Sequence, residues 1–88
     1  MYSFKISEHL QEIMKKLSKK DKTLYERLLG KIQEVITSDS IEHYKNLRYN
    51  MKDSKRVHIG HFVLVFQYNP TKNEILLDDF DHHDNIYK

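Results

Sequence analysis

The sequence contains no cysteine, one proline and only two glycines. Without cysteine, the chain has no disulfide framework, no thiolate zinc site and no cysteine nucleophile. Gly30 and Gly60 are too isolated to form a glycine-rich phosphate loop, and the sequence has neither a GxSxG nor an HExxH motif. Enzyme classes that depend on these motifs are therefore excluded.

Long apolar runs are absent as well. No segment approaches the roughly 18 apolar residues that span a bilayer, and the N-terminus lacks the basic and apolar regions of a signal peptide. We therefore expect a cytoplasmic protein with no membrane partner. The length of 88 residues predicts one domain over 1–88. A chain of this size buries only about 60–65% of its unfolded surface, so a partner would add to its stability.

Charge is distributed unevenly, although the net charge is only +2. Lys and Arg outnumber Asp and Glu by 13 to 8 over residues 1–56, whereas acidic residues lead by 5 to 2 over residues 57–88. A basic surface attracts phosphate backbones without sequence preference. The alternative is that the lysines simply solvate helix faces.

Two helices are expected after a short first strand at residues 2–6. Ser7 is a candidate N-cap for a helix with an apolar stripe from Leu10 to Leu17. Asp21 is a candidate cap for a second helix, with its stripe from Leu24 to Ile36. Because only Ser18–Lys20 separates the two stripes, the helices should form an antiparallel hairpin.

Three more strands are expected in the second half. Residues 56–59 alternate, residues 62–66 form a continuous apolar run, and residues 74–81 return after the turn signal at 69–73. Residues 41–54 fit either a short helix or an irregular crossing. We therefore predict an α+β fold of order β-α-α-β-β-β. It has one antiparallel sheet with the N-terminal helical hairpin packed on one face.

A cationic cluster surrounds the second predicted strand. Arg56 and His58 are two residues apart and share the face opposite Val57 and Ile59, which should be solvated. Four more cations lie upstream: Lys45, Arg48, Lys52 and Lys55. Such a cluster can grip a phosphate, with the arginine offering a forked pair of donors. The alternative is a charged sheet face that only maintains solubility.

The C-terminal segment combines acids with His82, His83 and Tyr87. Histidines among carboxylates suggest a metal site, but neighbouring residues on an extended chain point to opposite sides and would not chelate together. A second interpretation is acid–base chemistry by a histidine and the tyrosine hydroxyl. A third is an ordinary polar terminus with Tyr87 folded onto the sheet.

The order and spacing of these segments resemble the RelE/ParE superfamily of toxins from toxin–antitoxin systems. The family run RxRxGxYRVxY is matched by RVHIGHFVLVF at residues 56–66, and the late basic cluster before Val-Tyr is matched by HHDNIY at residues 82–87. The resemblance covers nearly the whole chain. It supports the predicted fold, which is that of the superfamily.

For RelE-like members, the resemblance implies a ribosome-dependent mRNA endonuclease in which a 2′-hydroxyl attacks the adjacent phosphate without metal or cofactor. On matched positions, Arg56 would stabilise phosphate charge, and Tyr87 with His82 or His83 would transfer protons. Lys52 and Lys55 would hold RNA, together with Lys45, Arg48 and His58. The implied partners are the ribosome and mRNA, a RelB-like antitoxin, and operator DNA reached only through the antitoxin complex.

One departure keeps two other functions open. The arginine that RelE-like toxins place in the central strand to stabilise the scissile phosphate is Val63 here. Loss of such a cation costs on the order of 10²–10³ in rate. His58 could substitute from the neighbouring strand. The alternatives are a ParE-like, non-catalytic toxin that poisons DNA gyrase and a degenerate toxin that only binds its antitoxin.

Overall fold

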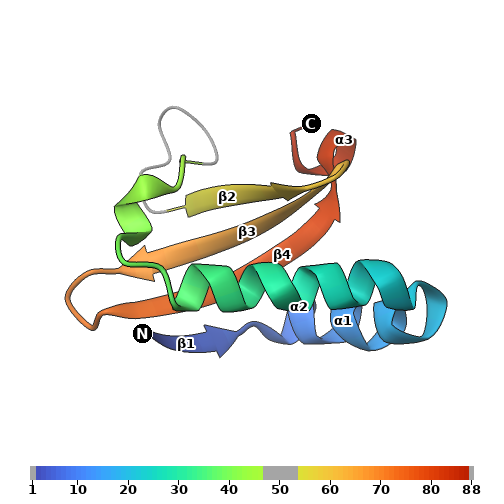
Figure 1. The fold of residues 1–88 in the computed structure, drawn as a ribbon, viewed down its shortest axis with the longest axis horizontal. Coiled ribbons are helices and arrows are strands. Elements are labelled where there is room, and N and C mark those ends of the chain that lie inside the picture. The colour runs from blue at the N-terminus through green and yellow to red at the C-terminus, as the bar shows by residue number, and fades with distance from the viewer. Residues whose placement is uncertain (1, 47–53, 88) are drawn as a thin grey trace.

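The computed structural model describes residues 2–46 and 54–87. Along the chain, the elements are β1 (Ser3–Ile6), α1 (Glu8–Lys20), α2 (Lys22–Ile36), the 3₁₀ turn η1 (Ile41–His43), β2 (Ser54–Ile59), β3 (Phe62–Asn69), β4 (Glu74–His82) and α3 (His83–Ile86). Figure 1 shows the hairpin of α1 and α2 lying along the sheet, with α3 at the far end of β4. The predicted α+β fold and the order of its main elements are confirmed.

The sheet has the strand order β1-β4-β3-β2. β2, β3 and β4 form the expected antiparallel meander. β1 instead pairs in parallel with β4, with Phe4 opposite Ile75 and Ile6 opposite Leu77. The sheet is therefore mixed and not wholly antiparallel. β4 runs in the same direction as β1. Parallel neighbours need a long connection, and the helices and the strands between β1 and β4 in sequence provide it.

Both helices begin where side-chain caps were expected. The Ser7 hydroxyl accepts a hydrogen bond from the Leu10 amide at 3.0 Å, and the Asp21 carboxylate accepts one from the Leu24 amide at 3.1 Å. The prediction that Ser18–Lys20 forms the connection is wrong, because α1 continues through Lys20. The Asp21 amide donates to the Leu17 carbonyl at 2.9 Å, so this one residue closes α1 and opens α2.

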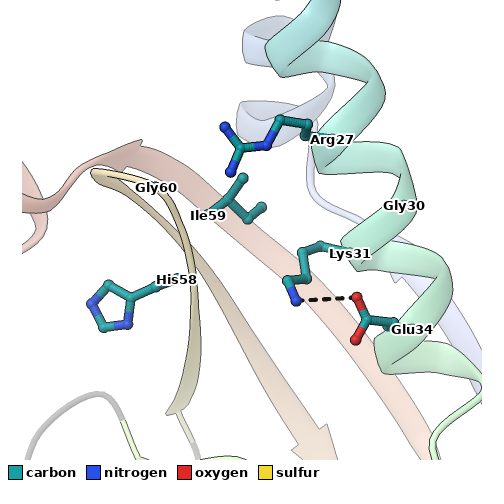
Figure 2. A pocket seen from close by; sticks show the side chains of 7 residues that line it. All are labelled: Arg27, Gly30, Lys31, Glu34, His58, Ile59 and Gly60. Carbon is teal, nitrogen blue, oxygen red and sulfur yellow. Dashed lines mark ion pairs between the residues drawn. The ribbon is translucent and has the colours of Figure 1, made fainter.

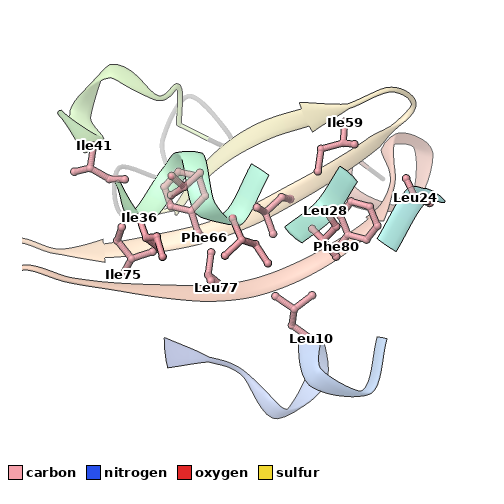
Figure 3. Packing of buried hydrophobic residues seen from close by; sticks show 13 residues of the cluster. Leu10, Leu24, Leu28, Ile36, Ile41, Ile59, Phe66, Ile75, Leu77 and Phe80 are labelled. Atoms are coloured by element: carbon pink, nitrogen blue, oxygen red, sulfur yellow. The ribbon is translucent and has the colours of Figure 1, made fainter. Parts of the chain in front are cut away.

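The core lies between the helical hairpin and one face of the sheet. Figure 3 shows Leu10 of α1 and Leu28 of α2 directed toward strand residues that include Phe66 and Leu77. Ser7 fixes the hairpin to β4, because its amide donates to the Leu77 carbonyl at 2.9 Å. The helices therefore cover the apolar face of the sheet, and they do not cover the opposite face of β2.

The segment after α2 crosses the end of the sheet. Its described part, residues 37–46, contains the turn η1, and the Ile41 amide donates to the Tyr2 hydroxyl at 3.1 Å. The Tyr44 ring packs edge-on against Phe66, with centroids 5.5 Å apart. In the described ranges 2–46 and 54–87, no helix is long and apolar enough to cross a membrane.

Neighbouring leucines on α2 test how much of the stability resides in this core. Leu28 is fully buried, whereas Leu29 remains 40% exposed. Leu28→Ala should lower the free energy of unfolding by about 3 kcal/mol, because it removes buried methyl groups and leaves a cavity. Leu29→Ala, the matched control, should lower it by less than about 1 kcal/mol. Urea unfolding followed by circular dichroism measures both, and equal losses would contradict this packing.

Candidate functional site

Two segments that are distant in the sequence meet at one end of the sheet. Val57 and Ile59 of β2 pack toward the core, so Arg56 and His58 point to the opposite face. There the Arg56 guanidinium carbon lies 5.8 Å from the centroid of the Tyr87 ring. The His58 and His83 rings stack with their centroids 5.8 Å apart, and the centroids of the His83 and Tyr87 rings are 4.6 Å apart. We call these four residues the β2–α3 cluster.

Hydrogen bonds hold both the backbone and the side chain of Arg56. Its amide donates to the Lys45 carbonyl at 2.9 Å, and its Nε donates to the Asn46 carbonyl at 3.1 Å. These bonds fix the guanidinium beside Tyr87, within the range of a cation–π interaction. The arginine is therefore a preorganised positive charge and not a freely moving surface side chain.

The remaining predicted RNA-binding residues divide into three groups. Lys45 is exposed. The Lys55 ammonium instead donates to the Tyr44 carbonyl at 3.3 Å and to the Asn46 side-chain oxygen at 3.2 Å, so it holds the preceding segment in place. Arg48 and Lys52 lie outside the described residues.

Tyr87 ends α3 with its ring half-buried. Its hydroxyl is buried and has no hydrogen-bond partner within the part of the chain that the structure describes. A buried polar group without a partner costs about 1–3 kcal/mol, and such groups are uncommon. The hydroxyl thus retains an unused capacity to donate or accept a hydrogen bond next to Arg56.

The side chains of His82 and His83 point in different directions, as expected for neighbouring residues at the end of a strand. His83 joins Arg56 and Tyr87. The His82 ring instead stacks on His61, with centroids 6.2 Å apart, and meets the edge of Phe62 at 5.6 Å. Its Nδ1 accepts a hydrogen bond from the Asp84 amide at 3.2 Å and caps α3. Of the two histidines proposed for proton transfer, the geometry brings His83 to the cluster.

The surroundings of His58 in the cluster shift its pKa. Loss of hydration beside its neighbours lowers the pKa of His58 below its usual 6.5, and the positive charges of Arg56 and His83 lower it further. The side chain nevertheless remains exposed. At neutral pH its imidazole is therefore mainly uncharged and able to accept a proton.

Two carboxylates share the face of the cluster. Asp79 lies opposite Val65, and Asp81 lies opposite Val63. The Asp81 oxygen accepts hydrogen bonds from the His82 amide at 2.7 Å and from the Asn85 side chain at 3.1 Å. Asp79 accepts bonds from the Phe80 amide and from His9. No group of three His, Asp or Glu residues positioned to hold a metal occurs among residues 2–46 and 54–87.

Val63 stands where the resemblance places an arginine. It is fully buried and lies directly opposite His58 on β2. Directly opposed residues in an antiparallel pair share a face, so His58 is the nearest counterpart of the missing arginine on β2. The substitution proposed from the sequence, with His58 acting from the neighbouring strand, is geometrically feasible.

Sequence reasoning missed His61. Its carbonyl accepts the His83 amide at 2.8 Å, and its ring stacks on His82. The residue lies in the turn between β2 and β3 next to Gly60, whose φ is +60°. A histidine at the tip of a hairpin gives no periodic signal, and the contact depends on where β4 ends.

A hollow of about 400 Å³ lies on the other side of β2, against α2. Its walls come from Arg27, Gly30, Lys31, Glu34, His58, Ile59 and Gly60. Figure 2 shows the His58 ring directed away from the α2 side chains, while Lys31 pairs with Glu34 at 3.1 Å. The hollow is therefore separate from the β2–α3 cluster, although both include part of His58.

No model of a known protein family matches this sequence. A protein of Methanocaldococcus jannaschii named "Putative toxin RelE4" is 46% identical over 89 residues, covering 100% of this chain and 93% of the relative. The isolated E. coli RelE toxin has a TM-score of 0.76 at 24% identity, covering 93% of this chain and 84% of that chain.

The E. coli RelBE toxin–antitoxin complex contains a chain with a TM-score of 0.75, also at 24% identity. It covers 93% of this chain and 96% of that chain. At this identity, the two solved structures establish the shared fold alone. The identity to the M. jannaschii protein extends across the whole sequence. The chain therefore belongs to the RelE family of toxins.

Proposed function

We propose that this chain is the toxin of a RelBE-type toxin–antitoxin system and that it inhibits translation by cutting mRNA on the ribosome. Family membership supports the first part. One observation carries the second: the Arg56 guanidinium lies 5.8 Å from the Tyr87 ring, beside the stacked pair of His58 and His83. A fixed cation and titratable groups are thus combined at one place.

The proposed reaction needs three groups. The 2′-oxygen forms a bond to phosphorus while the bond from phosphorus to the 5′-oxygen breaks, which leaves a cyclic 2′,3′-phosphate and a 5′-hydroxyl. A base must take the 2′-hydroxyl proton, an acid must protonate the leaving oxygen, and a cation must stabilise the charged phosphorane. No metal or cofactor is required.

The roles follow from the local environment of each side chain. Arg56 stabilises the phosphorane, because its position is fixed by bonds to Lys45 and Asn46. His58, whose pKa is lowered, accepts the 2′-hydroxyl proton. His83 delivers the proton to the leaving oxygen, because its side chain is half exposed, whereas the Tyr87 hydroxyl is buried.

Tyr87 then acts next to His83. Its ring holds the imidazole at 4.6 Å, and its hydroxyl can bond to the phosphate once the substrate displaces the groups that cover it. Lys45 contributes positive charge for the RNA, as Arg48 and Lys52 are predicted to do. Lys55 contributes by holding the segment that positions Arg56.

The ParE-like function is the second candidate, and Val63 favours it. A fully buried valine replaces the arginine that RelE-like toxins use at the phosphate. A toxin that binds gyrase needs no catalytic set, so it would tolerate this replacement. The two functions differ in their target, which makes them separable by experiment.

A RelB-like antitoxin is the proposed partner. The E. coli relative is a RelBE toxin–antitoxin complex, and this chain offers a basic N-terminal half of the sequence to an acidic, partly apolar tail. Such a tail would order on binding and cover a large part of a small toxin. Operator DNA would contact the antitoxin and not this chain.

Induction of this chain without its antitoxin should arrest growth and lower translation. Primer extension on transcripts should then reveal new 5′ ends, and purified protein should produce them only when ribosomes are present. If the purified protein produces the same 5′ ends without ribosomes, it is an RNase that does not depend on the ribosome. Intact transcripts with cleaved DNA in gyrase complexes would replace the nuclease with the ParE-like function.

A double substitution tests the proposed proton donor His83 together with Tyr87, which holds its ring. Tyr87→Phe combined with His83→Ala should reduce mRNA cleavage by about 10²–10³, because general acid–base catalysis contributes on this order. The matched control is Tyr25→Phe with His43→Ala, which makes the same chemical changes on α2 and η1 and should leave cleavage within about twofold. Circular dichroism checks that both variants are folded. Unchanged cleavage in the first variant would remove these residues from the mechanism.

The pH dependence tests the role of His58. Because its pKa lies below 6.5 in the folded chain, cleavage should persist down to that lowered pKa and fall as His58 becomes protonated. NMR titration of the His58 ring measures this pKa directly. Arg56→Gln should raise it toward 6.5 by removing a positive charge, whereas His9→Ala, on α1, should leave it unchanged. A pKa at or above 6.5 in the parent chain would contradict His58 as the base.

A further inference from the structure

α3 is a helix of only four residues, yet it carries the histidine and ends at the tyrosine of the β2–α3 cluster. A helix this short has no stability of its own, because nucleation is costly and few hydrogen bonds follow it. The positions of His83 and Tyr87 must therefore be imposed by contacts with the rest of the chain, among them those at the start of the helix. These contacts come from the end of β4 and the turn between β2 and β3.

His82 makes the capping contact. Its backbone is extended, with φ −60° and ψ 144°, and its Nδ1 accepts the Asp84 amide at 3.2 Å. An imidazole nitrogen accepts a hydrogen bond only when it carries no proton, so His82 must hold its proton on Nε2 in this arrangement. The Tyr87 amide in turn donates to the His83 carbonyl at 3.1 Å, which closes the single helical turn.

The His82 ring connects this cap to the core. It stacks on His61 and meets the edge of Phe62 at 5.6 Å. Phe62 stacks on Phe80 with centroids 5.2 Å apart, and Phe80 is buried in the core. A continuous series of ring contacts therefore runs from the core to the N-cap residue of α3. Each ring restricts the next by packing.

We propose that His82 is a positioning residue. It anchors α3 through its Nδ1 and its ring, and it thereby fixes His83 and Tyr87 beside Arg56. This role for His82 replaces a direct part in proton transfer. Its significance for RNA cleavage rests on the proposed function, whereas its effect on α3 does not. Two hydrogen bonds to the Asp81 carboxylate hold the same region. One is donated by the His82 amide and the other by the Asn85 side chain.

Three substitutions separate the two contacts of the His82 side chain. His82→Asn keeps an acceptor that is favoured at N-caps but removes the ring. His82→Phe keeps a ring against Phe62 but removes the acceptor, and His82→Ala removes both. His43→Ala is the control, because η1 lies at the opposite end of β2 from α3 (Figure 1).

Amide hydrogen exchange and the NMR signals of the Tyr87 ring report the anchor without any assay of activity. Exchange of the Tyr87 amide should rise about tenfold in His82→Ala and His82→Phe and stay within about twofold of the parent chain in His82→Asn. The Tyr87 ring signals should shift in His82→Ala, because the nearby His83 ring no longer has a fixed position. The Leu64 amide of β3 should be unaffected in all variants.

Cleavage kinetics complete the test. His82→Ala should lower kcat about tenfold or more with little change in KM, and His82→Asn should recover most of the loss. Unchanged Tyr87 exchange in His82→Ala, or no rescue by asparagine, would overturn the proposal. The same follows if α3 loosens while cleavage by the variant remains equal to that of the parent chain. If the parent chain cuts no RNA, the proposed function fails, while the exchange measurements still decide whether His82 anchors α3.

Discussion

Alternation of side chains along β2 is the constraint on which the candidate site depends. The burial of Ile59 and the packing of Val57 against the core fix the register and the face of this strand. Because successive side chains point to opposite faces, Arg56 and His58 must then emerge on the side away from the helical hairpin. A slip of one residue would exchange these faces, placing a guanidinium in the core and a valine at the site, so core packing and the location of positive charge are specified together.

Sequence patterns were sufficient for the elements and for part of the site. Apolar periodicity and caps located both helices, and the alternation of residues 56–59 correctly predicted that Arg56 and His58 share a face. The parallel pairing of β1 was not predicted, because the sequence of a four-residue strand does not indicate which strand it pairs with or in which direction. The separation of His82 from His83 was partly foreseen from extended geometry. The direction of each ring depended on where β4 stops and α3 begins, a boundary that propensity does not determine in so short a helix.

The acidic residues of the segment 57–88 would repel a phosphate, but local hydrogen bonding reduces this effect. The Asp81 carboxylate is engaged by the His82 amide and the Asn85 side chain, and Asp79 is engaged by the Phe80 amide and His9. Donors that surround a carboxylate offset part of its charge over the distance to a neighbouring strand. The same bonds hold the end of β4 and the start of α3. Formal charge counts along the sequence therefore do not describe the surroundings of the cluster, where Arg56 lies 5.8 Å from the Tyr87 ring.

The exchange of an arginine for Val63 changes the kind of chemistry that this face can support. An arginine is charged at every physiological pH, whereas the opposing residue here, His58, has a side chain that can lose its proton. Because loss of hydration and the positive charges of Arg56 and His83 lower the pKa of His58, a mainly uncharged base takes the place of a second permanent cation. For the proposed RNA cleavage, such a site would give up part of the electrostatic stabilisation of the phosphorane and gain a group that can take the proton of the attacking hydroxyl. The valine, being fully buried, also packs the centre of the face on which His58 and Arg56 stand. In the mechanism we propose, the loss of the family arginine and the presence of two stacked histidines are parts of one arrangement, in which proton transfer carries more of the catalytic effect than fixed charge.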